Sequence, residues 1–484
     1  MARVVVLGAG VSGHTAAAFL RKWLGWEHEV TVVSPQPDYN WIPSNIWVGV
    51  GLLRKEKVVF PLEPVYRKNE IDFKQARATA LYPDGIDGSP QPMVEIEWTA
   101  DGRAGVRERL PYDYLINATG PKLNFQATKG LGPGGNSLSV CTADHAEETA
   151  RVFLELVARM KRGERKRFLI GTGHGSCTCE GAAFEYVVNL EFELRSHGVR
   201  DKADITFITN EYELGDLGID GVHIRRGGYV TPSKIFTESL FAERGIESLT
   251  RAHVRAVEPG VAHYETLDGL RGEAPFDMAM LLPPFSGVGL KAYAADGKDI
   301  TDAVFAPNGF MKVDADYRKK PYEDWKASDW PRFYQSPLYR NLFAVGIAFA
   351  PPHPISPVRT TADGVVISPA PPRTGMPSAM IGKAVAHSIV NMIKGGDRPS
   401  HSASLAEMGA ACVASAGANP FTGTAASITV FPIVPDYERY PEYGRDVDRT
   451  FGEIGLAGHW IKILLHHMFL YKAHLWPGWS LIPE

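Results

Sequence analysis

The sequence predicts an α/β protein with two Rossmann-like dinucleotide-binding domains and a C-terminal membrane-associating segment. Residues 3–33 run as strand, glycine-rich turn, helix and strand, and residues 166–209 repeat that order. Two such βαβ starts indicate two domains, each built on a parallel sheet. An aromatic-rich amphipathic stretch near the C-terminus is the third observation.

The length of 484 residues is enough for two or three domains. We expect the first domain to resume after the second, because residues 341–346 again form an apolar strand ending in glycine. The predicted divisions are 1–165 for the first part of the first dinucleotide-binding domain, 166–300 for the second domain, 301–400 for the return to the first, and 401–484 for a C-terminal membrane-interaction region.

Composition excludes several classes of protein. With 51 Lys and Arg against 55 Asp and Glu, no basic excess exists to neutralise nucleic-acid phosphates. Four cysteines are too few for a disulfide scaffold. No apolar run is long enough for a transmembrane helix, and we expect no cleavable signal peptide, since a buried strand begins at Arg3.

The first turn carries the GxGxxG pattern of dinucleotide binding. Gly8 permits the tight turn, Gly10 lets the backbone approach a pyrophosphate, and Gly13 lets the helix predicted over 15–24 pack on the sheet. Amides at that helix N-terminus then favour the phosphates. A merely structural turn is the alternative, but the flanking strands 3–7 and 29–33 favour cofactor binding.

Further segments complete the predicted FAD site. The second strand ends in Ser34 where an acidic residue is usual, so ribose contact falls to Ser34 or to Asp38. Tyr114–Gly120 ends in Ala-Thr-Gly, which adds Thr119 and Gly120 to the expected FAD-binding residues. The proline-rich stretch 349–377 predicts a long ordered loop that lines a site.

The cysteines lie at predicted helix ends. Cys141 precedes a helix over 146–160, Cys177 and Cys179 open the helix over 181–196, and Cys412 follows a helical stretch over 404–411. A helix N-terminus lowers the pKa of a thiol, which suits a sulfur nucleophile. Buried inert thiols are the alternative, and for Cys412 alone the better one.

Zinc is a competing use of the Cys177 and Cys179 pair. Their one-residue spacing is shorter than that of zinc ligands, and no second pair follows, although His174 and His145 could be recruited. We therefore predict no metal site.

Five motifs resemble the sulfide:quinone oxidoreductase family, flavoproteins of the two-dinucleotide-domain disulfide reductase superfamily. They are Cys-Thr-Ala-Asp-His at 141–145, Cys-Glu-Gly-Ala-Ala-Phe-Glu at 179–185, Pro-Arg-Thr-Gly-Met at 372–376, Cys-Val-Ala at 412–414 and Phe-Leu-Tyr-Lys at 469–472.

That resemblance implies residue roles. Cys179 and Cys412 would carry the sulfur bridge, with Cys177 a possible substitute for Cys179. Cys141 would be the third family cysteine, which in some members attaches FAD covalently, while Glu185 would lie near the sulfide site and His145 would match a family histidine near the first cysteine. The implied substrates are sulfide and quinone; the other implied positions are Gly346, Thr374 and Gly375 for FAD, and Phe431, Phe469 and Lys472 for quinone.

Two other functions stay open. A type II NADH:quinone oxidoreductase would bind NADH at the second turn, with Glu211 as ribose ligand. Against this, Ser176 replaces the third glycine of that turn, and cysteines occupy the segment where the nicotinamide would bind. A non-catalytic flavin-binding membrane adaptor is the second alternative.

The C-terminal stretch predicts an amphipathic helix that lies in a membrane interface, as in a monotopic protein. Its alternative is packing on the protein's own core. We expect a peripheral protein of the cytoplasmic membrane surface and leave a homo-oligomer open. The apolar stripe is Trp460, Ile461, Leu464, Leu465 and Met468, the polar face is His459, Lys462, His466 and His467, and Trp476 and Trp479 follow.

Overall fold

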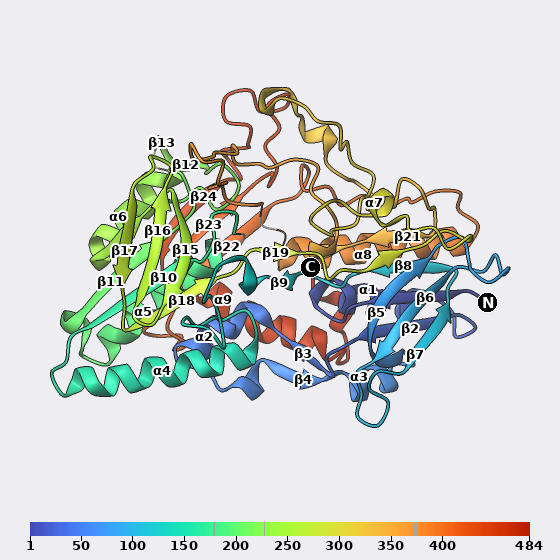
Figure 1. Cartoon of the computed structure of the whole chain (residues 1–484), viewed down its shortest axis with the longest axis horizontal. Coiled ribbons are helices and arrows are strands. Elements are labelled where there is room, and N and C mark those ends of the chain that lie inside the picture. Colours follow the sequence, from blue (N-terminus) through green and yellow to red (C-terminus); the bar gives the residue numbers. More distant parts are fainter. Residues whose placement is uncertain (178–179, 227, 372, 374) are drawn as a thin grey trace.

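The computed structural model describes residues 1–177, 180–226, 228–371, 373 and 375–484 (Figure 1). Its first sheet has the order β21-β8-β1-β2-β5-β6-β7. β1 pairs in parallel with β2 on one side and with β8 on the other, so its carboxyl end lies at the same edge of the sheet as theirs. The strands are β1 Arg3–Leu7, β2 Glu29–Ser34, β5 Asp72–Tyr82, β6 Met93–Trp98, β7 Arg107–Pro111, β8 Tyr114–Asn117 and β21 Leu342–Ala344.

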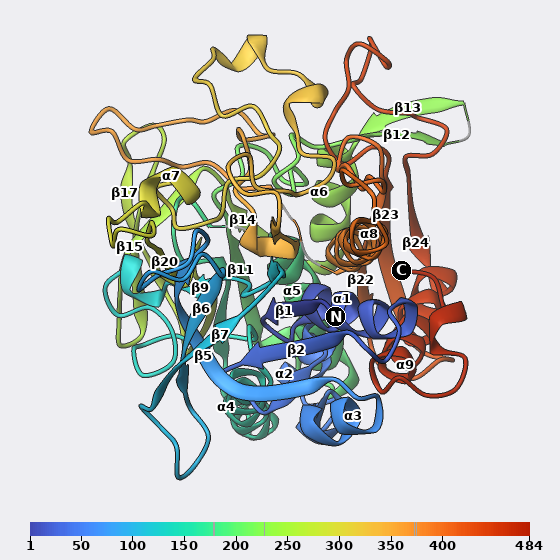
Figure 2. The ribbon, with the colours of Figure 1, turned by 90° about the vertical axis from the view of Figure 1, so that its right-hand side faces the viewer.

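Two helices cover this sheet side by side, α1 (Val11–Trp23) and α8 (Met376–Ile393) (Figure 2). Glycine permits their close approach, since a Cβ at Gly382 would lie 2.4 Å from the Ser12 carbonyl oxygen. α1 begins four residues before the predicted start at Thr15, because Gly10 already serves as the N-cap. The glycine-rich turn thus runs directly into the helix.

The second sheet is wholly parallel, with the order β14-β11-β10-β18. Its strands are β10 Lys166–Thr172, β11 Ala203–Ile208, β14 Ile246–Leu249 and β18 Met278–Leu282, and its helices include α4 Ala143–Lys161, α5 Glu180–Ser196 and α6 Ser233–Arg244. An antiparallel meander of β15 Ala252–Glu258, β16 Val261–Thr266 and β17 Arg271–Pro275 follows. The predicted α/β class with two Rossmann-like units is confirmed.

A third region is an antiparallel sheet of β22 (Ala410–Ala416), β23 (Thr424–Val430) and β24 (Phe451–Gly455), against which α9 (Leu456–Ala473) packs. The helix predicted over 404–411 is wrong. That stretch forms turns and then enters β22, whose partner β23 lies eight or more residues further along the chain. Pairing with that strand outweighs the local helix preference of alanine-rich sequence.

Shorter elements connect these layers. Residues 291–292 already rejoin the first sheet by pairing with β5. Within the described part of the chain, no helix is long and apolar enough to cross a membrane. The remaining elements are β3 Asp38–Asn40, β4 Val59–Pro61, β9 Lys122–Leu123, β12 His223–Arg226, β13 Tyr229–Pro232, β19 Phe285–Ser286, β20 Lys291–Ala292, α2 Asn45–Gly49, α3 Leu62–Lys68 and α7 Thr301–Val304.

Candidate functional site

The first glycine-rich turn forms an open cradle at the carboxyl end of β1. Gly8 has a φ of +103°, and a Cβ there would lie 2.2 Å from the Ala118 carbonyl oxygen. A Cβ at Gly13 would lie 2.1 Å from the Gly8 carbonyl oxygen. Gly10, by contrast, has no described atom within 4 Å of its Cβ position, so a phosphate can approach the backbone there.

Other predicted FAD residues lie on loops at the same edge of the sheet. Thr119 donates its hydroxyl to Asn117 Oδ1 at 2.8 Å after β8, and Gly120 follows with a φ of +68°. Gly346, after β21, has a Cβ position 2.4 Å from Ser12 Oγ. Gly375 is the N-cap of α8. These glycines and the open helix N-termini fit a dinucleotide, whereas Thr374 lies outside the described residues.

Ser34 is less available as a ribose ligand than the sequence suggests. Its buried hydroxyl donates to the Gln36 carbonyl at 3.1 Å and accepts from the Gln36 amide at 3.3 Å. Asp38, the alternative, is exposed at the start of β3. These contacts do not favour either Ser34 or Asp38 as the ribose ligand.

Arg373 is a buried cation beside the flavin-domain loop that the sequence did not assign a role. It donates to the carbonyl oxygens of Ile347, at 3.1 Å, and Phe349. Burial lowers the pKa of this guanidinium to about 9. Arg373 therefore fixes the short segment that follows Gly346.

Cys412 lies beside the first turn of α5. Its Sγ is 3.1 Å from the position that a Cβ of Gly181 would occupy. Gly181 is the second residue of α5 and follows Cys179 by two positions, although Cys179 itself lies outside the described residues. The structure thus brings Cys412, on β22, to the first turn of α5.

Cys177 occupies a different environment. It is fully buried, and its thiol donates to the carbonyl oxygens of Leu282 and Pro283 at 3.2 Å each. These carbonyls lie at and just beyond the end of β18. The Cys177 sulfur therefore faces the carboxyl end of β18 in the second sheet.

Glu185 is a buried carboxylate shared by three elements. From α9, Lys462 Nζ reaches its Oε1 at 3.0 Å and its Oε2 at 3.1 Å. From β22, the Ser415 amide donates to Oε1 at 3.4 Å. Burial raises the pKa of Glu185, and Lys462 opposes that rise. Lys462 was predicted only as part of a polar helix face.

Cys141 and His145 lie at the start of α4. Thr142 is the N-cap, and its hydroxyl oxygen accepts the His145 amide at 3.2 Å. The Cys141 amide donates to Ser139 Oγ at 3.1 Å. Burial lowers the pKa of His145, whose ring meets that of Phe125 edge-on. Cys141 therefore lies one residue before the N-cap of α4.

The structure brings together two of the three predicted quinone residues. Phe469 and Lys472 line one small cavity, where Phe469 stacks on Trp41 with ring centroids 5.2 Å apart. Lys472 is buried and donates to the Ile482 carbonyl at 2.7 Å. Phe431 stands elsewhere, at the end of β23, under the Arg449 guanidinium.

α9 turns most of its predicted polar face inward, whereas His467 is exposed. His459 Nδ1 lies 2.7 Å from Ser415 Oγ, and His466 Nδ1 lies 2.8 Å from Ser44 Oγ. Trp460, Ile461 and Leu464 are instead 52%, 51% and 56% exposed. The spacing of residues 459, 462 and 466 along a helix was the available signal for this buried polar stripe.

The second glycine-rich turn is covered by other parts of the chain. A Cβ at Gly173 would lie 2.4 Å from Leu131, and one at Gly175 would lie 2.3 Å from the Val366 carbonyl oxygen. The proline-rich loop predicted to line a site supplies this cover, since the Ser368 amide donates to the Gly175 carbonyl at 2.8 Å. The first turn has no such cover at Gly10.

Glu211, the possible ribose ligand of an NADH enzyme, is already engaged. Its buried carboxyl accepts from Thr209 Oγ1 at 2.9 Å and from the Leu217 amide at 2.8 Å. A ribose hydroxyl would have to replace these partners.

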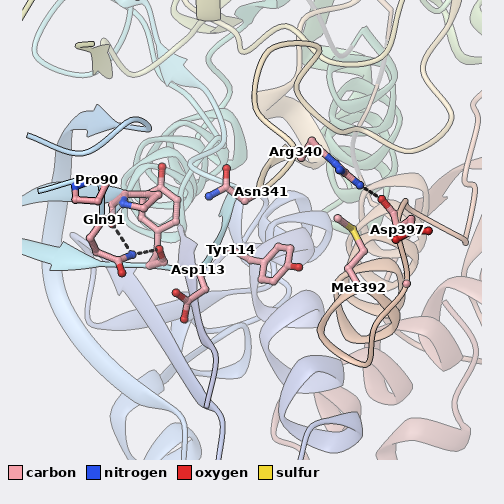
Figure 3. A pocket seen from close by; sticks show the side chains of 11 residues that line it. Pro90, Gln91, Asp113, Tyr114, Arg340, Asn341, Met392 and Asp397 are labelled. Atoms are coloured by element: carbon pink, nitrogen blue, oxygen red, sulfur yellow. Dashed lines mark hydrogen bonds between the residues drawn. The ribbon is translucent and has the colours of Figure 1, made fainter. Parts of the chain in front are cut away.

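A pocket of about 510 Å³ lies at the opposite edge of the first sheet (Figure 3). Its lining includes Asp113, Tyr114, Arg340 and Asn341, which stand at or just before the amino ends of β8 and β21. Cofactors of open α/β sheets bind beyond the carboxyl ends of the strands. We therefore do not place the active site in this pocket. No group of three or more metal-ligating side chains occurs among the residues that the structure describes.

Comparisons with known proteins agree with this arrangement. No protein-family model matches the chain. The sulfide-quinone reductase of Aquifex aeolicus strain VF5 is 32% identical over 471 residues, which cover 97% of this chain and 90% of that protein. The solved structure of the sulfide:quinone oxidoreductase from the same species has a TM-score of 0.74 at 29% identity and covers 98% of this chain and 92% of that one.

A more distant structure shares the fold alone. NDH2 from Plasmodium falciparum has a TM-score of 0.61 at 14% identity, covering 98% of this chain and 96% of that one. The near full-length match at 32% identity decides between the two groups. The chain belongs to the sulfide:quinone oxidoreductase family, whose members are flavin-dependent oxidoreductases.

Proposed function

We propose that this protein uses FAD to oxidise sulfide through a sulfur bridge between Cys179 and Cys412 and passes two electrons to a membrane quinone. One observation carries the proposal: Cys412 Sγ lies against Gly181 in the first turn of α5, two residues after Cys179. The family of the chain supports both substrates.

The sulfur step balances as a thiol–disulfide exchange. Hydrosulfide attacks one bridge sulfur, so a new S–S bond forms and the bridge bond breaks, leaving a persulfide on one cysteine and a thiolate on the other. The N-terminus of α5 stabilises the thiolate formed next to it. FAD, when bound, accepts the two electrons and delivers them to the quinone.

The chain's own residues would serve this chemistry at three places. Glu185 or His145 would move a proton near the sulfur, and Cys141 is the third cysteine of the site. Gly8, Gly10 and the segments that include Gly120, Gly346 and Gly375 would hold FAD. Quinone would approach along α9, near Phe469 and Lys472.

The second turn gives the NADH alternative less support. Leu131 and the proline-rich loop occupy the space next to Gly173 and Gly175. Glu211 has its carboxyl engaged within the protein. A nicotinamide dinucleotide would have to displace all three features, whereas sulfide needs none of that space.

An anaerobic titration tests the proposal. Sulfide is expected to bleach the flavin absorbance of the wild-type holoprotein, and NADH is not. Cys179→Ser and Cys412→Ser should each abolish bleaching by sulfide. Cys177→Ser should retain it. Loss of bleaching in Cys177→Ser with retention in Cys179→Ser would move the bridge to Cys177, and bleaching by NADH alone would refute the function.

We also propose that α9 docks on a membrane surface. Trp460, Ile461 and Leu464 are exposed while His459 and His466 of the polar side are buried, which leaves an apolar surface for a membrane interface. The triple change of these three residues to Ser should greatly reduce co-sedimentation with phospholipid vesicles. Leu154→Ser, at a 42% exposed position on α4, is the matched control and should bind as the wild type does. Equal binding of all three proteins would refute docking through α9.

A further inference from the structure

The turn between β22 and β23 carries an exposed aromatic side chain that the proposed function does not use. Phe421, in this turn of residues 417–423, is 85% exposed. Its chain neighbours Pro420 and Thr422 are exposed as well. A large apolar side chain that is open to solvent marks a binding surface when it belongs to a larger apolar patch.

The turn is joined to α9, so that Phe421 and the exposed side of the helix belong to one surface. Trp460 Nε1 donates to the Pro420 carbonyl oxygen at 2.6 Å, which places the half-exposed indole next to the turn. Ile461 and Leu464 continue the exposed apolar surface along the helix. Figure 2 shows β22, β23 and α9 together on one side of the molecule.

His459 fixes the position of the turn relative to α9. Its Nε2 lies 2.9 Å from the Asn419 carbonyl oxygen, and because a carbonyl only accepts, Nε2 carries the hydrogen. Its Nδ1 lies 2.7 Å from Ser415 Oγ on β22. The ring packs directly on Gly423, where a Cβ would collide with Nε2. One buried side chain of the helix therefore holds both the strand and the turn that follows it.

The backbone of the turn is suited to an apolar surrounding, where an unpaired amide or carbonyl is costly. The Asn419 carbonyl oxygen accepts from the Thr422 and Gly423 amides at 3.3 and 3.1 Å. The Phe421 amide donates to Asn419 Oδ1 at 2.8 Å. Pro420 has no amide hydrogen, and its carbonyl is already engaged by α9. These polar groups at the tip of the turn are thus satisfied within the protein.

The distribution of charge favours a lipid bilayer as the partner of this surface. Residues 408–435, which include the turn, contain no Asp, Glu, Lys or Arg. Over residues 454–471 Lys462 is the one such residue, and it is turned inward to its ion pair with Glu185. An interface with another protein usually has a polar rim, whereas a surface that enters a bilayer excludes charge.

We propose that the 417–423 turn inserts into the bilayer beside α9, with Phe421 as a second membrane anchor. This inference rests on the proposed docking of α9 and extends it to a second element of the fold. A single interfacial helix leaves the rest of the protein free to tilt about the helix axis. A second anchor on a turn that is bonded to the helix fixes that tilt.

Phe421→Ser is the main test. Because the side chain is 85% exposed, its removal takes away little packing within the protein. We expect the variant holoprotein to bind phosphatidylcholine vesicles about 10-fold more weakly than the wild type in co-sedimentation. The loss should be the same at low and high ionic strength, because the turn carries no charge. Phe421→Trp should bind at least as tightly as the wild type, since Trp favours the membrane interface.

Leu270→Ser is the matched control. Leu270 is a 68% exposed apolar residue in the turn between β16 and β17, and β17 lies at the left of Figure 2 while α9 lies at the right. This variant should bind vesicles as the wild type does. Flavin content and thermal melting check that each variant folds. Phe421→Ser should also keep the wild-type rate of flavin bleaching by sulfide, a step that needs no membrane.

The outcomes separate this proposal from those on which it rests. Weaker binding of Phe421→Ser, repaired in Phe421→Trp, supports the second anchor. If Phe421→Ser binds as the wild type does while the triple variant of α9 binds weakly, the second anchor is wrong and docking through α9 stands. If the wild type binds no vesicles, both membrane proposals are wrong, whereas bleaching by sulfide still tests the sulfur chemistry.

A second copy of this chain is the other occupant that the test identifies. If Phe421→Ser lowers the oligomeric mass in sedimentation equilibrium without vesicles and leaves vesicle binding unchanged, the surface joins copies of the chain. That result would overturn insertion of the turn into a bilayer.

Discussion

The two glycine-rich turns of this molecule have the same local design and opposite surroundings. At the first, the Cβ position of Gly10 has no described atom within 4 Å. At the second, the Cβ positions of Gly173 and Gly175 lie 2.4 Å from Leu131 and 2.3 Å from Val366. One turn is open to a ligand, and the other is filled by the chain itself.

The helices that follow the two turns also differ, in the charge of the residues that they bury. α1 contains no acidic residue, and its buried face is mostly small or apolar. α5 buries four carboxylates, Glu180, Glu185, Glu191 and Glu193. Glu191 is neutralised by Arg195, Arg200 and Arg244. Burying charge is expensive, so each of these acids needs a partner, a proton or a function.

The comparison shows that the same βαβ motif occurs twice in this fold with different surroundings at its glycine-rich turn. At the first turn the backbone is open at Gly10, and the proposed FAD binding would use backbone groups that a side chain would obstruct. At the second turn the backbone is covered, and the proposed chemistry would depend on side chains of α5 and β22. Function therefore follows from the surroundings of the turn rather than from its glycine pattern.

Blocking the open first turn with a side chain should have the largest effect of the changes considered, on FAD binding. Gly10→Asp places a carboxylate where the phosphates are expected, in a backbone conformation with φ −74° that any residue adopts. Repulsion between like charges and the lost approach to the backbone should weaken FAD binding by at least about 100-fold, or about 3 kcal/mol. Flavin absorbance after purification and titration of the apoprotein measure this loss.

Gly455→Asp is the matched control. Gly455 also has no described atom within 4 Å of its Cβ position, and its φ of 163° is ordinary extended backbone. It should retain FAD. Normal flavin content in Gly10→Asp would mean that the open turn is not the cofactor site.

The fold was largely predictable, because its signals are local. The turn at Gly8–Gly13 and its flanking strands are recognisable from consecutive residues, and so is the second βαβ unit. The failure at 404–411 has a non-local cause. Alanine and serine there are compatible with a helix, and only pairing of β22 with β23 selects a strand.

The site was predictable only in part, because its contacts join distant residues. The resemblance named Cys412 and Glu185, but no local pattern shows that Lys462, 277 residues away, reaches Glu185. The cover of the second turn by the proline-rich loop is likewise tertiary. The bonds from α9 to the 417–423 turn are tertiary as well, and no local pattern predicts them.

Removing the cation that pairs with Glu185 of α5 should have the next largest effect, on the stability of the protein. Lys462→Met leaves the Glu185 carboxylate buried without its cation, which should destabilise the protein by about 3 kcal/mol at pH 8. Because Lys462 lowers the pKa of Glu185, its removal raises that pKa further. Protonation then relieves the unpaired charge, so the loss should shrink as the pH falls to 5.

Urea unfolding at the two pH values measures this change. Lys462→Arg keeps a cation and should recover part of the loss, while adding Glu185→Gln to Lys462→Met removes the stranded charge and should also recover stability. A pH-independent loss that neither change repairs would show that Lys462 acts through packing alone.

Neutralising Glu193 of α5, whose carboxyl has no ion-pair partner among the described residues, should have the smallest effect, and of opposite sign. Burial raises the pKa of Glu193 from 4.5 to about 7. Between these values the folded protein binds more protons than the unfolded chain, so Glu193 makes stability fall as the pH rises from about 4.5 to about 7. Glu193→Gln removes that term and should be more stable than the wild type by about 1–3 kcal/mol at pH 8 but nearly equal at pH 5. Unfolding of both proteins at the two pH values measures the difference. A gain of the same size at both pH values would place the effect in packing, and the acids of α5 would then differ from the small residues of α1 in size rather than in charge.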